Sequence, residues 1–410
     1  MKIYLVGGAV RDSLLNYPVK EHDWVVVGAS VQQMLDLGYQ QVGKDFPVFL
    51  HPETKDEYAL ARTERKTSSG YTGFSVHTTP DVSLEDDLLR RDLTINAMAQ
   101  DDKGKIIDPY QGQQDLNNKL LRHVSPAFSE DPVRILRVAR FAARYAHLGF
   151  TVAADTLQLM SSMVSAGEVD ALVAERIWQE MHKALGERNP EVFFTLLREC
   201  GALQKILPEL DCLFGIPQPE KHHPEIDTGL HSMMVLQQAV ILSPQPVIRF
   251  AALMHDLGKG QTPQSAWPSH HGHEEKGVKT IQAVCQRLRI PNDFRDLAII
   301  TSRYHLHVHR AFELKPATLL KTLEGLDAIR KGDRFESFLL ACEADAKGRK
   351  GYEHSDYPQG GYFKQARELA TNIDIAPLKE QNLQGKEMAD AIRQLRLQAL
   401  KSLKTSVSQG

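Results

Sequence analysis

The pattern of apolar residues along this chain of 410 residues changes once, near Asp131. Before that point, short β-rich runs alternate with turns, and we expect strands at Lys2–Val6, Trp24–Val27, Val48–Leu50 and Tyr58–Arg62. After it, apolar residues recur every three or four positions in long stretches, and we expect helices at Pro132–Ala146, Ala171–Gly186, Pro190–Gly201 and Ser232–Leu242. The sequence therefore predicts an α/β head followed by an all-α body.

Composition narrows the class of protein. With 42% hydrophobic residues, the chain is long enough for two or three domains, each with its own core. No run of about 18 apolar residues occurs and the first strand leads straight into a Gly-Gly turn, so we expect no membrane span, no signal peptide and a cytoplasmic protein. The four cysteines are scattered, which favours reduced thiols. A net charge of −3 means that any nucleic-acid binding must use a local basic surface.

The helical part of the sequence contains two expected domain boundaries and one segment rich in histidine. The polar stretches Phe214–Thr228 and Gly348–Gly361 are the expected boundaries within it. Ten of the 17 histidines fall between His222 and His309, which indicates a segment with its own chemistry. We therefore predict four parts, namely a head (1–140), a helical neck and body (141–225), a histidine-rich domain (226–350) and a helical tail (351–410).

A Gly-Gly turn and two carboxylates form the first candidate site. Gly7 and Gly8 follow the first strand and precede a short helix, so their backbone N–H groups suit a phosphate. Glu21 and Asp23 open the next strand, and strand alternation places both carboxylates on one face. Such a pair repels itself unless a cation lies between, and Mg²⁺ there could bridge a nucleoside triphosphate and activate an attacking hydroxyl. Taken alone, the pair is more often a solvated strand end.

The helix expected after Asp131 carries four arginines on one stripe, namely Arg134, Arg137, Arg140 and Arg144. Asp131 and Pro132 are expected as its N-cap and its first helical residue. No acidic residue balances the stripe, which favours a phosphate-binding surface over an ordinary solvated face.

Asp131 and Arg134 also suit the pairing edges of two bases. Cytosine and adenine each present an exocyclic amino donor beside a ring-nitrogen acceptor, whereas guanine and uracil present a carbonyl beside an N–H group. Because Asp accepts and Arg donates, this pair of side chains would accept C and A and reject G and U. The alternative interpretation is a plain N-capped helix.

The third candidate site combines His231, the pair His255-Asp256 and Asp345. Neutral imidazoles and carboxylates are good ligands for a divalent transition metal, of which Ni²⁺ is one candidate. Further ligands or phosphate contacts could come from the other clustered histidines, which are His270, His271, His273, His305, His307 and His309. A lone histidine is usually structural, but the enrichment favours a metal site.

Three ordered motifs, Gly7 to Asp12, Glu21-x-Asp23 and Arg90 to Ala99, resemble the class II CCA-adding and poly(A) polymerase family. The resemblance implies a nucleotidyltransferase head of the DNA polymerase beta superfamily that binds catalytic Mg²⁺ through Glu21 and Asp23. It also implies that ATP and CTP are contacted by Gly8, Arg11, Arg91, Arg137 and Arg140.

Within this resemblance, Glu130-Asp131-x-x-Arg134 is similar to the family's amino-acid template, which implies that Asp131 and Arg134 bind the nucleotide base. The family usually has Asp where this chain has Glu21, and the extra methylene shifts the carboxylate without changing its charge. We expect function to survive this change. Glu57 is a candidate third carboxylate on the metal side.

The order His231, His255-Asp256, Asp345 resembles the HD phosphohydrolase superfamily. Together with the head, it identifies the chain as similar to the bacterial multifunctional CCA protein family. The resemblance implies CCA addition to tRNA from CTP and ATP, and an HD domain with 2′,3′-cyclic phosphodiesterase, 2′-nucleotidase and phosphatase activity. Such an enzyme could repair a damaged tRNA end before extending it, as a monomer or a homodimer.

Two other functions remain compatible with these motifs. A poly(A) polymerase shares the head, but such enzymes tend to have a strongly basic C-terminal extension, whereas Ala391–Gly410 holds four basic residues. A tRNA-binding protein whose HD region senses a nucleotide without turning it over is the second alternative. Loss of all activity on replacing Asp23 or His255 would argue against it.

Overall fold

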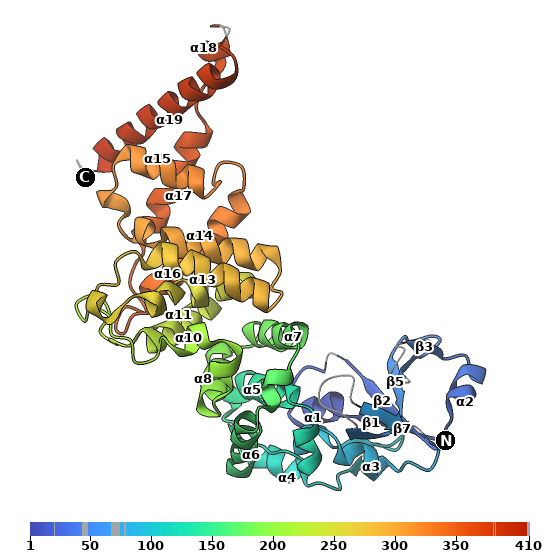
Figure 1. Cartoon of the computed structure of the whole chain (residues 1–410). Helices are drawn as coiled ribbons and strands as arrows, with labels where there is room; N and C mark the ends of the chain where they lie inside the picture. The colour runs from blue at the N-terminus through green and yellow to red at the C-terminus, as the bar shows by residue number, and fades with distance from the viewer. Residues whose placement is uncertain are drawn as a thin grey trace. The chain divides into compact units, whose positions relative to one another are not determined.

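The computed structural model describes residues 1–19, 21–42, 48–66, 74–77, 79–379, 381 and 383–407, so the last three residues of the predicted tail lie outside the described part. The chain divides into two units, Met1–Ile206 and Leu207–Gly410 (Figure 1). The first holds the strands and the second is helical. The finer divisions at residues 140, 225 and 350 stay predictions.

A seven-stranded sheet with the order β3-β4-β5-β2-β1-β8-β9 forms the framework of the first unit. Its strands are β1 (Lys2–Val6), β2 (Asp23–Val27), β3 (Gln40–Val42), β4 (Val48–Leu50), β5 (Glu57–Leu60), β8 (Ala99–Gln100) and β9 (Ile106–Ile107). All neighbours are antiparallel except β2 and β5, which are parallel. The predicted strands are confirmed, although β2 begins one residue earlier and β5 spans Glu57–Leu60 instead of Tyr58–Arg62.

Both faces of this sheet are covered. Neighbouring residues of β2 point to opposite faces, yet Val25 and Val26 are both buried. Val25 packs in one apolar cluster with Leu88 of α3 (Leu84–Leu89), and Val26 packs in another with Met34 of α2 (Val31–Asp36). The continuous Val run of β2 follows from this burial on two sides.

The remaining strands and helices of the first unit follow in chain order. The strands form two small pairs, β6 (Thr63–Lys66) with β7 (Phe74–His77), and β10 (Leu120–Leu121) with β11 (Thr151–Val152). The helices are α1 (Gly8–Leu14), α4 (Gly112–Asn117), α5 (Val133–Tyr145), α6 (Ala154–Ser165), α7 (Ala174–Leu185), α8 (Pro190–Glu199) and α9 (Ala202–Ile206).

Helix α5 lies largely buried against α7 and α8. The expected start of α5 is wrong by one residue, because Pro132 occupies the N-cap position and the helix begins at Val133. Asp131 still caps the helix, since its Oδ1 accepts a hydrogen bond from the Val133 N–H at 3.1 Å. The first turn of α5 therefore fixes the position of the Asp131 carboxylate.

The second unit consists of α10 (Pro208–Asp211), α11 (Thr228–Leu242), α12 (Pro246–Met254), α13 (His273–Arg287), α14 (Asn292–His309), α15 (Pro316–Gly325), α16 (Gly332–Lys347), α17 (Pro358–Thr371), α18 (Ala376–Lys379) and α19 (Gly385–Val407). Helices α11, α12, α14 and α16 pack against one another, and α13 packs on α14. A Cβ on Gly258 would collide with the carbonyl oxygen of His273. Glycine therefore allows the segment after α12 to lie directly on the start of α13.

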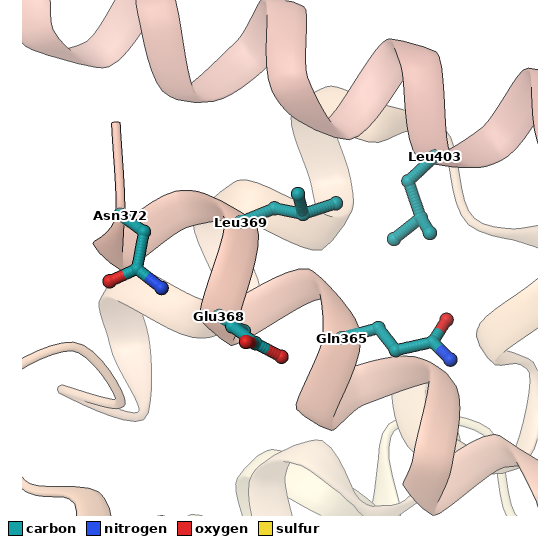
Figure 2. Close-up of a pocket in the computed structure, with 5 residues that line it drawn as sticks. All are labelled: Gln365, Glu368, Leu369, Asn372 and Leu403. Atoms are coloured by element: carbon teal, nitrogen blue, oxygen red, sulfur yellow. The ribbon is translucent and has the colours of Figure 1, made fainter. Parts of the chain in front are cut away.

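A pocket of about 400 Å³ lies beside α17 and α19, lined by Gln365, Glu368, Leu369, Asn372 and Leu403 (Figure 2). None of the residues expected in a functional site lines it. Across the described part of the chain, no helix combines the length and the apolar character needed to cross a membrane.

Candidate active sites

The corner between β1 and α1 is built around a glycine whose backbone conformation would be strained in any other residue. Gly7 has a φ of 67°, in the left-handed region, and a Cβ there would lie 2.7 Å from Arg91 Nη1. Arg91 also donates to the carbonyl oxygen of Asn96 at 3.3 Å and to Asp87 Oδ2 at 3.2 Å. The corner therefore brings a fixed guanidinium beside the Gly7-Gly8 turn.

The two predicted metal-binding carboxylates lie at the start of β2. The expectation that Glu21 belongs to this strand is wrong, because β2 begins at Asp23 and Glu21 lies in the segment before it. The two groups are nevertheless coupled. Partial desolvation by the surrounding protein raises the pKa of Asp23 although its side chain is still accessible to solvent, the Arg91 charge lowers it, and the Glu21 charge raises it further.

The register of the sheet adds a third carboxylate to this place. Asp23 of β2 pairs with Glu57 of β5 in the parallel ladder, so the two side chains lie on the same face of neighbouring strands. Glu21, Asp23 and Glu57 are all exposed. An open group of oxygen ligands suits Mg²⁺, which retains several waters and takes only one or two carboxylates from a protein.

The expectation that the arginine stripe of α5 lacks acidic partners is wrong. The acids come from other segments: Arg137 pairs with Asp92 at 2.7 Å, Arg140 with Glu180 at 2.6 Å and Arg144 with Asp12 at 3.1 Å. Arg134 donates instead to two backbone carbonyls, of Ala127 at 2.8 Å and of Arg90 at 2.7 Å. The stripe is therefore held rigidly in place.

One aromatic ring gathers three of the arginines expected to contact nucleotide. The guanidinium carbons of Arg11, Arg137 and Arg140 lie 5.0, 5.7 and 4.5 Å from the centre of the Phe141 ring. Arg11 comes from α1 and the other two come from α5. The structure thus brings cations from both parts of the first unit to one place, as triphosphate binding requires.

A buried polar network joins these two helices. Asp92 Oδ2 accepts from Arg137 Nε at 2.7 Å, and its Oδ1 accepts from Asn96 Nδ2 at 2.8 Å. Asn96 Oδ1 in turn accepts from Arg11, whose Nε donates to Asp12 at 2.9 Å. Asp92 and Asn96 were not expected in the site, although both lie within the motif Arg90 to Ala99.

The Asp92 carboxylate is expected to contribute pH-dependent stability. Burial alone raises the pKa of Asp92, but Arg137 and the hydrogen bond from Asn96 outweigh it and lower the pKa well below its usual value. Asp92→Asn should therefore lower the free energy of unfolding by about 2 kcal/mol at pH 7. Because the folded-state pKa is depressed, the difference should shrink as the pH falls below about 4.

Urea unfolding of both proteins over a pH series from 7 down to about 2 measures this effect, because the contribution of Asp92 is lost only as the pH falls toward its depressed folded-state pKa. The exposed Asp102→Asn is the control. A loss of stability that stays the same over the whole series would contradict the ionic role of Asp92.

Asp131, one of the two residues predicted to read the base, is bound by a residue that sequence analysis missed. Arg176 of α7 donates from Nη1 to Asp131 Oδ1 at 3.0 Å and from Nη2 to Asp131 Oδ2 at 2.7 Å. This two-pronged pair fixes the plane of the carboxylate. Oδ1 also accepts from Val133 N–H, so Oδ2 has more acceptor capacity left.

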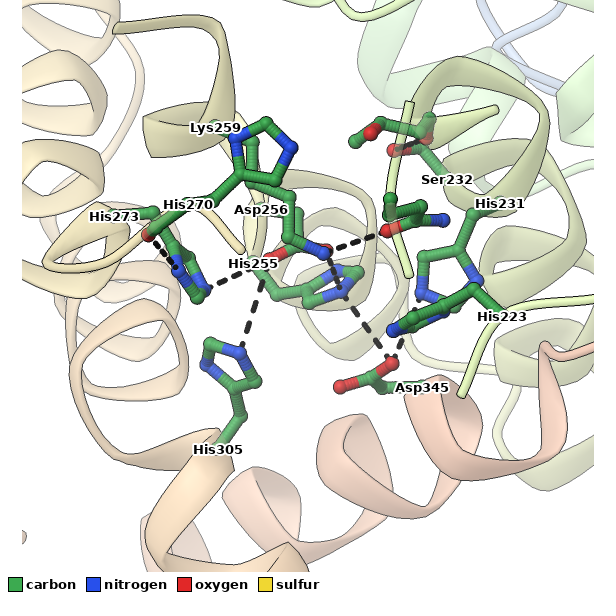
Figure 3. A network of polar contacts seen from close by, with 12 residues as sticks. His223, His231, Ser232, His255, Asp256, Lys259, His270, His273, His305 and Asp345 are labelled. Carbon is green, nitrogen blue, oxygen red and sulfur yellow. Dashed lines mark hydrogen bonds and ion pairs between the residues drawn. The ribbon is translucent and has the colours of Figure 1, made fainter. Parts of the chain in front are cut away.

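The second unit holds a cluster of buried histidines and aspartates (Figure 3). Two groups have ligand atoms close enough to share an ion, namely His231, His255 and Asp345, and Asp256, His273 and His305. His255 and Asp256 are neighbours in sequence but belong to different groups. All the groups of this kind among the described residues lie in the second unit, and a third joins His231 to His223 and Glu225.

Hydrogen bonds on the far side of each ring direct these histidines toward the cluster. His255 Nδ1 lies 2.7 Å from the Ala252 carbonyl oxygen, His273 Nδ1 lies 3.0 Å from that of His270, and His305 Nδ1 lies 3.0 Å from that of Ser302. Since a carbonyl only accepts, each Nδ1 carries a proton, and in the neutral form of each ring Nε2 presents a lone pair.

The inward atoms fit a divalent metal. His255 Nε2 lies 3.0 Å from Asp256 Oδ2 and His273 Nε2 lies 3.2 Å from Asp256 Oδ1. Despite this proximity, both nitrogens and Asp256 Oδ1 are buried without a hydrogen bond of acceptable geometry. Lone pairs that converge without a shared proton are the arrangement expected of metal ligands.

Comparison with family models assigns the two candidate sites to two different families. Residues 3–122 match the family model for the Poly A polymerase head domain, and residues 228–329 match the HD domain. Residues 149–213 match a model described as the probable RNA and SrmB-binding site of polymerase A.

Two relatives match almost the whole chain. Multifunctional CCA protein from Thioalkalivibrio sulfidiphilus (strain HL-EbGR7) is 63% identical over 404 residues, covering 98% of this chain and 99% of that protein. The chain belongs to the multifunctional CCA protein family. Multifunctional CCA protein from Teredinibacter turnerae (strain ATCC 39867 / T7901) is 61% identical over 406 residues, covering 99% of each.

Solved CCA-adding enzymes share the fold. A complex with ATP has a TM-score of 0.67 at 18% identity, covering 97% of this chain and 86% of the other. A Thermotoga maritima enzyme complexed with tRNA has a TM-score of 0.62 at 18% identity, covering 99% and 91%. The predicted fold, a nucleotidyltransferase head followed by an all-α body with an HD domain, is confirmed. The chain is a CCA-adding nucleotidyltransferase with an HD domain.

The charge balance of the HD cluster also calls for a cation. Burial lowers the pKa of His255, but Asp256 and Asp345 outweigh it and raise the pKa to about 9. Burial lowers the pKa of His305 to about 3 despite the same carboxylates. Lys259 Nζ lies 2.6 Å from Asp256 Oδ2 and offsets one of the two buried carboxylates. A proton on His255 or a divalent metal can offset the other.

The other clustered histidines have different roles in the HD domain. His270 contacts Thr262 Oγ1 and the Pro217 carbonyl oxygen, and His307 contacts Thr322. His271 is exposed. Sequence analysis missed Glu225, whose Oε1 lies 3.0 Å from His231 Nδ1 and orients that ring from behind.

Proposed function

We propose that this enzyme adds CCA to the 3′ end of tRNA from CTP and ATP, and that its HD domain hydrolyses phosphates at damaged tRNA ends. The near-complete match to multifunctional CCA proteins carries the proposal. We place the activity in the cytoplasm because tRNA is the substrate. Mg²⁺ in the head and a divalent transition metal such as Ni²⁺ in the HD domain are the cofactors that we propose.

The chemistry of the head is a displacement at phosphorus. The tRNA 3′-oxygen forms a bond to the α-phosphorus of the nucleotide, the bond to the β-phosphate breaks, and pyrophosphate leaves. Glu21 and Asp23 would hold Mg²⁺, which would supply Lewis-acid activation of the attacking hydroxyl and offset negative charge on the triphosphate. Glu57 is proposed as a further carboxylate on this side, because it lies beside Asp23 in the sheet.

The arginines of the first unit are proposed to offset the charge of the triphosphate. Arg91 lies beside the Gly7-Gly8 turn, where the Gly8 N–H is a further candidate donor, and Arg11, Arg137 and Arg140 surround Phe141. Their pairing with Asp and Glu fixes them before substrate arrives. Preorganised cations act on developing charge without a cost of reorganisation.

Asp131 and Arg134 are proposed to read the base. The exocyclic amino group of C or A would donate to Asp131 Oδ2, and Arg134 would donate to the ring nitrogen. Both side chains are fixed, by Arg176 and by two backbone carbonyls. A rigid donor and acceptor reject G and U because those bases would place a carbonyl against the Asp131 carboxylate and an N–H group against the Arg134 guanidinium.

Arg176 is therefore expected to support base selection. Arg176→Gln should lower kcat/KM for CTP and ATP by about tenfold and raise the relative use of UTP, because a carboxylate free to rotate reads the base less strictly. Arg176→Lys, with one point charge instead of a fork, should fall in between.

Incorporation of each of the four labelled nucleotides measures the effect, with Arg188→Gln as an exposed arginine control. Equal losses for all four nucleotides in Arg176→Gln would show that Arg176 supports general binding and not selection.

The test of the proposed function uses a tRNA transcript that lacks its CCA end, with Mg²⁺ and each labelled nucleotide in turn. Two C and one A should be incorporated. Long A tracts would instead identify a poly(A) polymerase, which shares the head. A protein that binds this tRNA and incorporates nothing would act through its HD domain alone.

A further inference from the structure

A chain of side chains connects the HD cluster to the helical tail. Asp345 of α16 directs its two carboxylate oxygens to different partners. Oδ1 lies 3.1 Å from His231 Nε2 and 3.5 Å from His255 Nε2, inside the cluster. Oδ2 lies 2.7 Å from Nε2 of His309, the last residue of α14, and His309 Nδ1 lies 3.0 Å from the hydroxyl of Tyr357.

The direction of each hydrogen bond in this chain follows from its two ends. Burial raises the pKa of Tyr357 well above its usual value, so the phenol keeps its proton and can donate. A carboxylate can only accept, so His309 donates to Asp345 from Nε2 and accepts from Tyr357 at Nδ1. His309 is thereby fixed in one tautomer and one ring orientation.

Asp345 is held differently from the other candidate ligands. The rings of His255, His273 and His305 are each oriented by the backbone carbonyl three residues earlier. The Asp345 carboxylate depends on side chains from two other segments, α14 and the residue before α17. His309 lies within the matched HD domain, which covers residues 228–329, whereas Tyr357 lies beyond it.

We propose that His309 and Tyr357 are positioning residues of the HD metal site, which fix the Asp345 carboxylate so that its Oδ1 faces His231 and His255. The inference rests on the proposed metal site of the HD domain. A ligand whose rotation is restricted loses less entropy on binding a cation, so removing its support weakens metal binding even when the ligand itself remains.

Calorimetric titration of the full-length protein with Ni²⁺ tests the proposal, with excess Mg²⁺ present to occupy the head. His309→Ala should raise the dissociation constant by about 10- to 100-fold, in the range for partners of metal ligands. Tyr357→Phe, which removes one oxygen, should raise it by about three- to tenfold. His309→Gln should stay near wild type, because its amide nitrogen can still donate to Asp345.

The matched control is Tyr362→Phe, which removes the hydroxyl from a tyrosine within α17. Nucleotide incorporation into tRNA by each variant checks that the chain is folded. Wild-type affinity for Ni²⁺ in both His309→Ala and Tyr357→Phe would overturn the positioning role and leave the proposed metal site unaffected. If the wild-type HD domain binds neither Ni²⁺ nor Mn²⁺, both the proposed metal site and the positioning role are overturned.

Discussion

Asp23→Asn is expected to lower CCA addition by about 10³-fold or more, because loss of a metal-binding carboxylate removes several kcal/mol of transition-state stabilisation. Asp23 lies at the start of β2, beside Glu57 and within the influence of Glu21 and Arg91. The substitution keeps the shape of the side chain and removes its charge. Single-turnover incorporation of labelled CTP into tRNA lacking CCA measures the effect.

The matched control is Asp36→Asn on α2, an exposed carboxylate that bonds only the neighbouring Gln32 among the hydrogen bonds described. Its activity should equal that of the wild type. Hydrolysis of 2′,3′-cyclic AMP should be unchanged in both variants, since the HD cluster lies in the other unit. Retention of more than a tenth of wild-type incorporation by Asp23→Asn would refute the catalytic role of this carboxylate.

His255→Ala is expected to lower phosphohydrolysis by about 10³-fold or more, because loss of a metal ligand removes stabilisation of the transition state here as well. His255 Nε2 is directed into the cluster by the bond from Nδ1 to Ala252. CCA addition to tRNA with a free 3′-hydroxyl should be unaffected. On tRNA ending in a 2′,3′-cyclic phosphate, extension should be lost, because that end offers no hydroxyl to the nucleotide.

His271→Ala is the control, since His271 is exposed and adjacent in sequence to His270, a buried histidine of the same unit. It should retain both activities. Equal extension of the cyclic-phosphate tRNA by wild type and His255→Ala would disprove repair before addition. Equal hydrolysis of a small cyclic phosphate would disprove the catalytic role of the cluster itself.

Sequence patterns predicted the class of the fold and much of the HD cluster because these signals are local. The strand runs and helix periods depend on which residues are buried, and the pair His255-Asp256 lies in one short motif. His273 and His305 were predicted only as members of a larger set of histidines. Their selection required knowledge of which helices pack together, since each reaches Asp256 from a different helix.

The environment of the arginine stripe could not be predicted for a similar reason. Arg137 and Asp92 are 45 positions apart, and Arg144 and Asp12 are 132 apart. A helix without acidic residues looks unbalanced in sequence, whereas the structure supplies the acids from the segment between α3 and β8 and from α1 and α7. Arg176 was missed because its pair with Asp131 depends on the packing of α7 against α5.

The turn between β4 and β5 helps to set which face of the sheet carries the Glu57 carboxylate. Six residues, His51 to Asp56, join the strands, and His51 N–H bonds the Asp56 carbonyl oxygen at 3.0 Å. A side chain changes face with every residue of a strand, so a slip by one position would turn Glu57 to the opposite side of the sheet. A change of length in this turn would therefore preserve the carboxylate group only if the turn absorbed it and left the register of β5 against β2 unchanged.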